Sequence, residues 1–192
     1  RKAHGKDPQA VFPLGRILPD SSGVRQDARS PETLRLVYAG NLGAGYDIGT
    51  MLAGVSDLAA NGIKVSLTVA GDGPQSKKVA ERACAHPAIT YLGYLGQQDL
   101  QAAIASCDVG VIPMFQASWV AVPNKVADYA ACGLAMINGL AGETQMLLDK
   151  YQAGIGYKTG DRGSFRNAVR KYAGDARSEE HTSELQSHSD LV

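Results

Sequence analysis

The sequence predicts an α/β fold built on a parallel, doubly wound, Rossmann-like sheet. Short apolar runs alternate with amphipathic stretches along residues 34–173, which is the pattern of strands joined by crossover helices. The chain has 192 residues, of which 44% are hydrophobic, enough for the core of one ordinary domain. It contains no run of 18 apolar residues, so we expect no transmembrane helix.

Six strands and six helices follow from this alternation. The apolar runs predict strands at residues 34–39, 64–70, 89–92, 108–113, 135–137 and 154–157. The amphipathic stretches predict helices at residues 46–60, 75–85, 97–106, 144–151, within 122–133, and around 165–172. Ligands of such sheets bind at the carboxyl ends of the strands. The loops that follow the strands are therefore the candidates for function.

Composition argues against several classes of protein. The three cysteines, Cys84, Cys107 and Cys132, are an odd number without metal-ligand spacing, and we expect reduced core thiols in a cytoplasmic protein. The formal net charge is zero, which argues against a nucleic-acid-binding surface. Neither a metal-binding histidine cluster nor a Ser-His-Asp or Cys-His arrangement is present. We therefore expect no metal and no cofactor.

Both ends of the sequence differ from its middle. Residues 1–30 are mixed and turn-rich, and we expect a linker or the end of a preceding domain. Residues 177–192 have the composition of a disordered tail and resemble a translated sequencing adapter. The expected folded domain is therefore residues 31–176, and we expect the chain to be a fragment.

The stretch from Val122 to Glu143 concentrates the polar side chains of interest. Asn124 is a good helix N-cap, and Lys125 and Asp128 lie three residues apart, on one helix face. A cation, a carboxylate and a helix N-terminus suit a ligand that carries phosphate and hydroxyls. The alternative is that Lys125 and Asp128 form an ordinary surface ion pair.

Other loops offer weaker signals. The glycine-rich loop 40–45 either serves a tight turn or lets a phosphate approach the backbone. Loop 71–74 is best explained as turn chemistry. Tyr94, between glycines, either borders a flat base or packs inward. Trp119, the only tryptophan, is a ligand contact, an interface contact or the anchor of a lid.

Taken in order, these loops resemble one known family. The matching segments are YAGNLG (38–43), VAGDGP (69–74), YLGYL (91–95), ASCDVGVIP (105–113), PNKVADYAACG (123–133) and Gly142-Glu143. Together they resemble the C-terminal, donor-binding half of GT-B fold glycosyltransferases of the retaining family 4 type. The resemblance covers about residues 11–173 and implies a nucleotide-diphosphate sugar as the donor.

The resemblance also implies roles for particular residues. Gly43 resembles the glycine that lets the donor diphosphate approach, and the backbone of Tyr94 and Leu95 resembles the segment that holds the base. Asp128 stands where the family binds ribose hydroxyls. Lys125, at the start of the same helix as Asn124, is expected to stabilise the diphosphate in catalysis. Further predicted donor contacts, in a sugar pocket, are Ser118, Trp119 and Glu143.

Two departures from the family pattern leave alternatives open. Val120 stands eight residues before Asp128, where an acid would contact the transferred sugar, although an alignment with a two-residue insertion puts Ser118 there. The first glycine loop lacks the usual Arg and Lys and carries residues 44–47, Ala-Gly-Tyr-Asp, instead. The chain is thus predicted to be half of a transferase, inactive alone, or a catalytically silent nucleotide-sugar-binding module. An epimerase or phosphorylase is a third possibility.

The predicted reaction transfers a sugar to an acceptor hydroxyl with retention, in the synthesis of polysaccharides or glycoconjugates. A glycan or lipid-linked acceptor would bind through an N-terminal domain that this chain lacks. The expected location is the cytoplasm, and the inner face of a membrane is the alternative for the whole enzyme.

Overall fold

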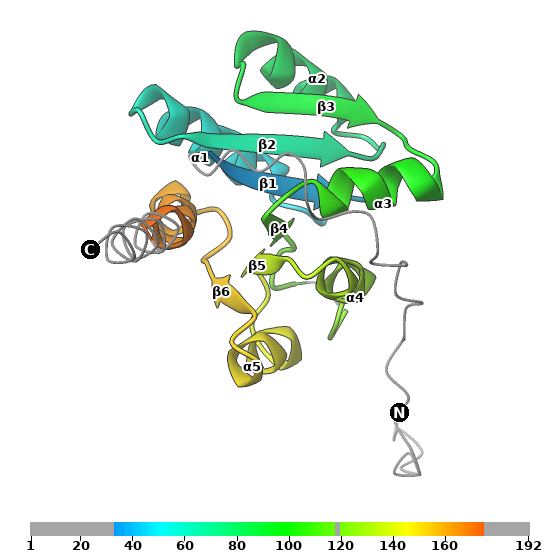
Figure 1. The fold of residues 1–192 in the computed structure, drawn as a ribbon, viewed down its shortest axis with the longest axis vertical. Coiled ribbons are helices and arrows are strands. Elements are labelled where there is room, and N and C mark those ends of the chain that lie inside the picture. Colours follow the sequence, from blue (N-terminus) through cyan, green and yellow to red (C-terminus); the bar gives the residue numbers. More distant parts are fainter. Residues whose placement is uncertain (1–32, 118–119, 175–192) are drawn as a thin grey trace, which may run out of the picture.

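The computed structural model describes residues 33–117 and 120–174 as one six-stranded sheet flanked by helices (Figure 1). The strand order is β3-β2-β1-β4-β5-β6, and every pairing is parallel. The strands are β1 (Leu34–Ala39), β2 (Val65–Ala70), β3 (Ile89–Gly93), β4 (Val109–Ile112), β5 (Ala135–Asn138) and β6 (Gly154–Gly156). The predicted fold class and all six predicted strands are confirmed.

The helices alternate with the strands, as crossover connections require. They are α1 (Ile48–Ala60), α2 (Ser76–Ala85), α3 (Gln97–Ala105), α4 (Asn124–Ala131) and α5 (Glu143–Lys150). Residues 162–174 form a further helix, which lies beside α1 in Figure 1. The predicted helix at residues 46–60 begins later, at Ile48, because Asp47 is its N-cap and its carboxylate accepts the Thr50 N–H at 3.2 Å.

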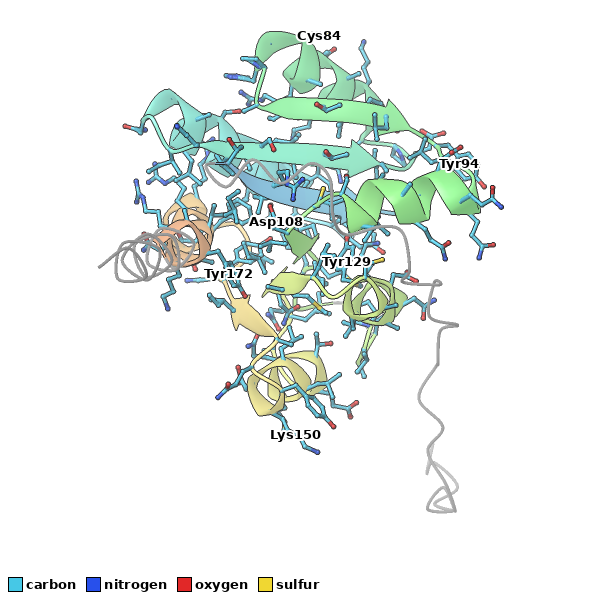
Figure 2. The ribbon with its side chains drawn as sticks, in the orientation of Figure 1. Cys84, Tyr94, Asp108, Tyr129, Lys150 and Tyr172 are labelled. Atoms are coloured by element: carbon cyan, nitrogen blue, oxygen red, sulfur yellow. The ribbon has the colours of Figure 1, made fainter. Side chains whose placement is uncertain are left out.

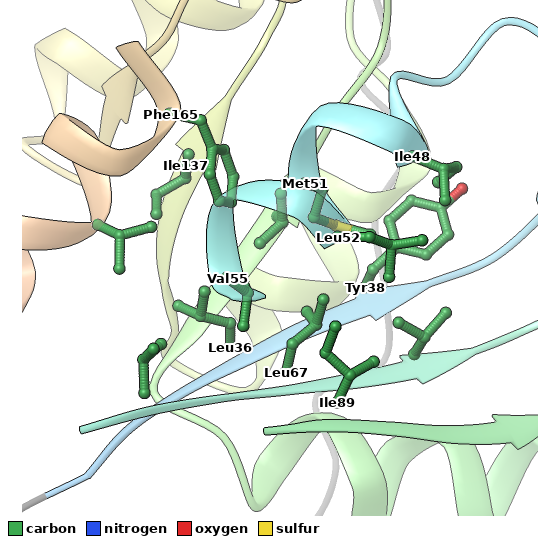
Figure 3. Packing of buried hydrophobic residues seen from close by; sticks show 14 of the residues in the cluster. Leu36, Tyr38, Ile48, Met51, Leu52, Val55, Leu67, Ile89, Ile137 and Phe165 are labelled. Carbon is green, nitrogen blue, oxygen red and sulfur yellow. The ribbon is translucent and has the colours of Figure 1, made fainter. Parts of the chain in front are cut away.

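The sheet is covered on both faces, and strand periodicity assigns the side chains. On β1, Leu36 and Tyr38 enter one buried cluster with α1, whereas Val37 and Ala39 enter a second cluster with α3, α4 and α5. Figure 3 shows the first cluster, in which the aromatic ring of Phe165 lies over α1. Gly54 is needed there, since a Cβ would come within 2.5 Å of the Phe165 ring.

The order of the strands reverses between β1 and β4. These two neighbours share only two register pairs, Leu36–Val109 and Val37–Gly110. Beyond them the buried hydroxyl of Tyr129, from α4, donates to the Val111 carbonyl at 3.3 Å and accepts the Ala39 N–H at 3.0 Å. This hydroxyl bridges the two strands where they part, and it anchors α4 to both of them.

Other features hold the opposite edge of the sheet. Arg35 and Asp108, at the amino ends of β1 and β4, form an ion pair at 2.9 Å. The hydrogen bonds that the Arg35 side chain donates to the Asp108 carboxylate raise the pKa of Arg35. The expectation of three core thiols is wrong for Cys84, which is exposed on α2 because it lies on the outer face of that helix (Figure 2). Cys107 is buried, and all three cysteines are free.

We predict that Tyr129→Phe lowers the free energy of unfolding by about 1–3 kcal/mol, because the buried Ala39 N–H loses its acceptor. Urea denaturation followed by circular dichroism measures this change. Tyr151→Phe is the matched control, since Tyr151 is 64% exposed, and it should leave the stability unchanged. A Tyr129→Phe variant as stable as the wild type would contradict the assigned role of the hydroxyl.

Candidate functional site

A hollow of about 270 Å³ opens at the carboxyl ends of β1 and β2 and against the loop after β3. This is the edge of the sheet at which doubly wound folds bind ligands. Its lining residues come from three of the predicted loops, from the last residue of β2 and from α3: Gly40, Asn41, Ala70, Gly71, Asp72, Tyr94, Leu95 and Leu100.

The floor of the hollow is bare backbone. Gly71 has a φ of +140°, and a Cβ there would overlap the carbonyl oxygen of Gly40. The Gly40 N–H donates to the Ala70 carbonyl at 2.8 Å, which ties the two loops together. With no side chain between them, a ligand can approach the main chain of both loops.

Asp72 faces this floor, and its carboxylate already has partners. It accepts the Gly73 N–H at 2.7 Å and the Ser76 hydroxyl at 2.6 Å. The hydrogen bond from Ser76 is the main cause that lowers the pKa of Asp72, with the bond from Gly73 second. These contacts close the turn into α2, which begins at Ser76, while Gly71 and Asp72 of the same loop also line the hollow.

Lys125 reaches this region from α4, across the point where β1 and β4 part. Its ammonium lies 4.9 Å from the centroid of the Tyr38 ring and 4.8 Å from that of Tyr46. It also lies against Gly40, where a Cβ would overlap it. Gly40 also lines the hollow, whereas Lys125 and Asp128 are not among its lining residues.

The surroundings of Lys125 change its protonation. Burial lowers the pKa of Lys125 to about 8, and the nearby carboxylate of Asp128 opposes that shift. The two residues therefore do interact, as their spacing on α4 predicted. Lys125 is only partly accessible to solvent, so the alternative of a fully exposed surface pair does not describe it.

The prediction that Asn124 caps α4 is wrong. The N-cap is Pro123, Asn124 is the first helical residue and is exposed, and no side chain of the described residues caps this helix. Pro123 has an extended backbone with a φ of −73°. It therefore occupies the cap position that the sequence suggested for Asn124. The first turn of α4 thus offers backbone N–H groups without a side-chain acceptor.

The start of α1 differs in this respect from the start of α4. The buried carboxylate of Asp47 accepts the Thr50 N–H and, at 2.5 Å, the Gly160 N–H. Its negative charge lies at the positive end of the α1 dipole. An anion over the glycine-rich loop 40–45 therefore gains little from the dipole of α1.

The remaining predicted residues lie in several places. Tyr94 is 83% exposed at the edge of the hollow (Figure 2), which rules out inward packing, and Leu95 lines the hollow beside it.

Gly43 is not in the lining, and its carbonyl accepts the side-chain amide of Gln75 at 2.7 Å. Glu143 is exposed in the first turn of α5. Ser118 and Trp119 lie outside the described residues.

Two loops that hold predicted sugar contacts are bound to each other. Gln116 donates to the Gly139 carbonyl at 2.5 Å and accepts the Ala141 N–H at 3.0 Å. The Thr144 hydroxyl donates to the Ala121 carbonyl at 2.5 Å. These bonds hold the loop before α4 against the loop before α5, which brings the start of α5, with Glu143, next to the segment that precedes Asn124.

The sequence did not predict the aromatic rings around Lys125 or the hydrogen bonds from Gln75 that hold the glycine-rich loop 40–45. The side-chain amide of Gln75 donates to the carbonyls of both Gly43 and Tyr46, at 2.7 and 3.2 Å. No local pattern links Gln75 to this loop, or Lys125 to Tyr38 and Tyr46, because these residues are distant in sequence. Asp47 did carry a signal, since an Asp just before an apolar helical stripe is a typical N-cap.

Two further searches cover the described residues only. Within residues 33–117 and 120–174, no three His, Cys, Asp or Glu side chains are grouped so that they could bind a metal ion. No helix in these same segments combines the length and the apolar character needed to cross a membrane.

Comparison with known proteins identifies relatives of the chain. The family profile described as glycosyl transferases group 1 matches residues 33–175. No curated protein matches the chain significantly.

Several solved structures share the fold. HepE (Alr3699) of Anabaena, in complex with UDP and glucose, superimposes with a TM-score of 0.61 at 13% identity, over 76% of this chain and 40% of HepE. WaaG, a glycosyltransferase involved in lipopolysaccharide biosynthesis, gives 0.56 at 16% identity, over 81% and 43%. Sucrose-phosphate synthase of Thermosynechococcus elongatus gives 0.57 at 18% identity, over 77% and 38%. The matched region thus spans about two fifths of each of these proteins.

We predict that Gly71→Ala lowers the free energy of unfolding by about 2–5 kcal/mol, because the new Cβ meets the Gly40 carbonyl and the backbone is strained at φ +140°. Gly62→Ala is the matched control, with φ +76° and open space around the position. It should cost only about 1–2 kcal/mol. Equal losses in urea denaturation would show that the contact between the two loops contributes nothing.

Proposed function

This chain belongs to the glycosyl transferases of group 1, and we propose that it forms the half that binds a nucleotide-diphosphate sugar. The observation that carries the proposal is the position of Lys125. Its ammonium lies against Gly40 at the edge of a hollow whose floor is bare backbone. A partly buried cation beside accessible main chain suits a diphosphate.

The diphosphate would bind between Lys125, the start of α4 and the glycine-rich loops. The first turn of α4 has no side-chain cap in the described part of the chain, so its N–H groups and the positive end of its dipole favour an anion. Lys125 is on the same turn and adds a full charge. Asn124, exposed beside it, would be a further polar contact to the donor.

The nucleoside would occupy the hollow. The exposed ring of Tyr94 borders it, and the backbone of Tyr94 and Leu95 is available for hydrogen bonds to a base. Asp128 would accept the ribose hydroxyls, because a carboxylate can accept two such donors at once. Gly43 would contribute as part of the loop that contacts the diphosphate, and Ser118, Trp119 and Glu143 as contacts to the sugar.

The chemistry that follows is the departure of the nucleoside diphosphate from the sugar, with transfer to an acceptor hydroxyl and retention of configuration. Negative charge grows on the diphosphate as its bond to the sugar breaks. An ammonium already in position stabilises that charge without reorganising solvent.

The acceptor, a glycan or a lipid-linked glycan, would bind to a further domain, which is consistent with a match to about two fifths of the structural relatives. We place the complete enzyme in the synthesis of polysaccharides or glycoconjugates.

A second candidate function is a nucleotide-sugar-binding module without transferase activity. Val120 supports it, since this residue stands where the resemblance implies an acid that contacts the transferred sugar. The two functions predict the same donor binding but differ in turnover. Transfer or slow hydrolysis of the donor by the complete protein would exclude the silent module.

Isothermal titration of the 192-residue chain with UDP-glucose and with a GDP-sugar tests the donor-binding proposal directly. The Anabaena neighbour was solved with UDP-glucose, so that donor is the first probe. Saturable binding of either nucleotide sugar is the expected result. A folded chain that binds neither would overturn the proposal.

We predict that Asp128→Asn weakens the affinity for the bound nucleotide sugar by about ten- to a hundredfold, because the ribose hydroxyls lose a charged acceptor. The thermal melting temperature should stay close to that of the wild type. Asp149→Asn, an exposed change at the far end of α5, is the matched control. Unchanged affinity in the Asp128 variant would show that another group binds the ribose.

We predict that UDP binds roughly ten times more weakly at pH 9 than at pH 7.5. The pKa of Lys125 is about 8, so its ammonium is mostly charged at the lower pH and mostly neutral at the higher one. The titratable groups that face it are Asp128, Tyr38 and Tyr46, and burial raises the pKa of Tyr38 well above this range. Titrations at both pH values measure the effect.

The control for this pH dependence is Lys125→Met. That variant should bind UDP weakly at both pH values and show little difference between them. A pH dependence that persists in Lys125→Met would have to come from another group. Wild-type affinity that stays constant from pH 7.5 to 9 would show that Lys125 does not contact the diphosphate.

A further inference from the structure

The ammonium of Lys125 lies between two tyrosine rings. Its nitrogen is 4.9 Å from the Tyr38 centroid and 4.8 Å from the Tyr46 centroid, both within the range of a cation–π contact. The two rings contact each other edge to face, with centroids 5.9 Å apart and planes at 70°. We call Tyr38 and Tyr46 the aromatic cage.

Each wall of the cage is fixed independently of Lys125. Tyr38 belongs to β1, is fully buried, and donates its hydroxyl to the Asn41 carbonyl. Tyr46 ends the glycine-rich loop, and its carbonyl accepts the Gln75 side chain at 3.2 Å. Tyr46 also forms a β-bridge with Met114, beyond the end of β4. The cage therefore spans the point where β1 and β4 part.

A lysine in such a cage differs from one in solvent. A free lysine side chain has many rotamers and loses their entropy when it is fixed on a ligand. The cage and Gly40 hold the ammonium in one place before any ligand arrives, so that less entropy remains to be lost on binding. The rings also remove water from the ammonium, which strengthens its attraction to an anion.

We propose that Tyr46 is a positioning residue, whose ring holds the Lys125 ammonium beside Gly40 for the diphosphate of the donor. Tyr46 acts through Lys125 and does not touch the ligand itself. The inference rests on the proposed function, since it assumes that Lys125 contacts the diphosphate. The positioning role goes beyond the proposed function, because it names the residue that holds this lysine in place. That residue belongs to segment 44–47, which has no basic side chain.

The test compares UDP binding by Tyr46→Phe and Tyr46→Leu in the 192-residue chain. Tyr46→Phe keeps the ring and should bind UDP as the wild type does. Tyr46→Leu keeps apolar bulk but removes the ring face, and should weaken binding about three- to tenfold. Tyr46→Met is a second variant without a ring, in case the leucine variant does not fold as judged by circular dichroism.

A double-mutant cycle separates positioning from general damage to the loop. Combined with Lys125→Met, the change Tyr46→Leu should weaken UDP binding no further, because the residue through which it acts is gone. The pH at which UDP affinity begins to fall should also move downward in Tyr46→Leu, because the ring face that stabilises the charged ammonium is lost while apolar bulk remains beside it. A purely structural role of Tyr46 would instead weaken binding equally in both backgrounds.

The outcomes distinguish the two proposals. If Lys125→Met weakens UDP binding while Tyr46→Leu binds as well as the wild type or better, the positioning role is overturned and the donor site stands. Additive losses in the double variant also overturn the positioning role. If Lys125→Met binds UDP as the wild type does, the assignment of Lys125 to the diphosphate fails, and the positioning role fails with it.

Discussion

The parting of β1 from β4 is the feature on which the rest of the site depends. Two strands that pair at only two positions leave backbone groups without partners beyond them. The Tyr129 hydroxyl satisfies two of these groups, the Ala39 N–H and the Val111 carbonyl. Gly110 makes room for its ring, because a Cβ there would overlap it. The same side chain, Tyr129, thus satisfies the strands where they part and fixes α4 beside the site.

From that anchor the position of Lys125 follows. Lys125 precedes Tyr129 by four residues, so the two lie one helical turn apart on α4, on the same side of the helix. The tyrosine side chain enters between the strands, and the lysine side chain extends over their ends to Gly40. A residue on the helix after β4 thereby supplies a charge to the loop after β1. This explains how the loop can present a cation although residues 40–47 include no Lys or Arg.

The sequence predicted the sheet well because each strand is a short apolar run closed by turn residues. It predicted the strand-end loops for the same reason, and Tyr94 and Leu95 do border the hollow. It failed where the deciding contact is distant in sequence. Asn124 has the chemistry of an N-cap, but Pro123 takes that position. The aromatic cage pairs Tyr38 of β1 with Tyr46, which is bridged to Met114. The spacing of residues along the sequence does not predict that arrangement.

The two helix starts at this edge of the sheet have opposite electrostatic roles. At α1 the buried Asp47 occupies the N-terminus and binds the loop at Gly160, so that helix is used to hold the fold together. At α4 Pro123 provides no side-chain hydrogen bond, and the nearest charge in the first turn is the cation of Lys125. An anion that approaches between them meets a negative charge on one side and a positive charge on the other. An anion between them is therefore attracted toward Lys125, which lies beside Gly40 at the start of the glycine-rich loop.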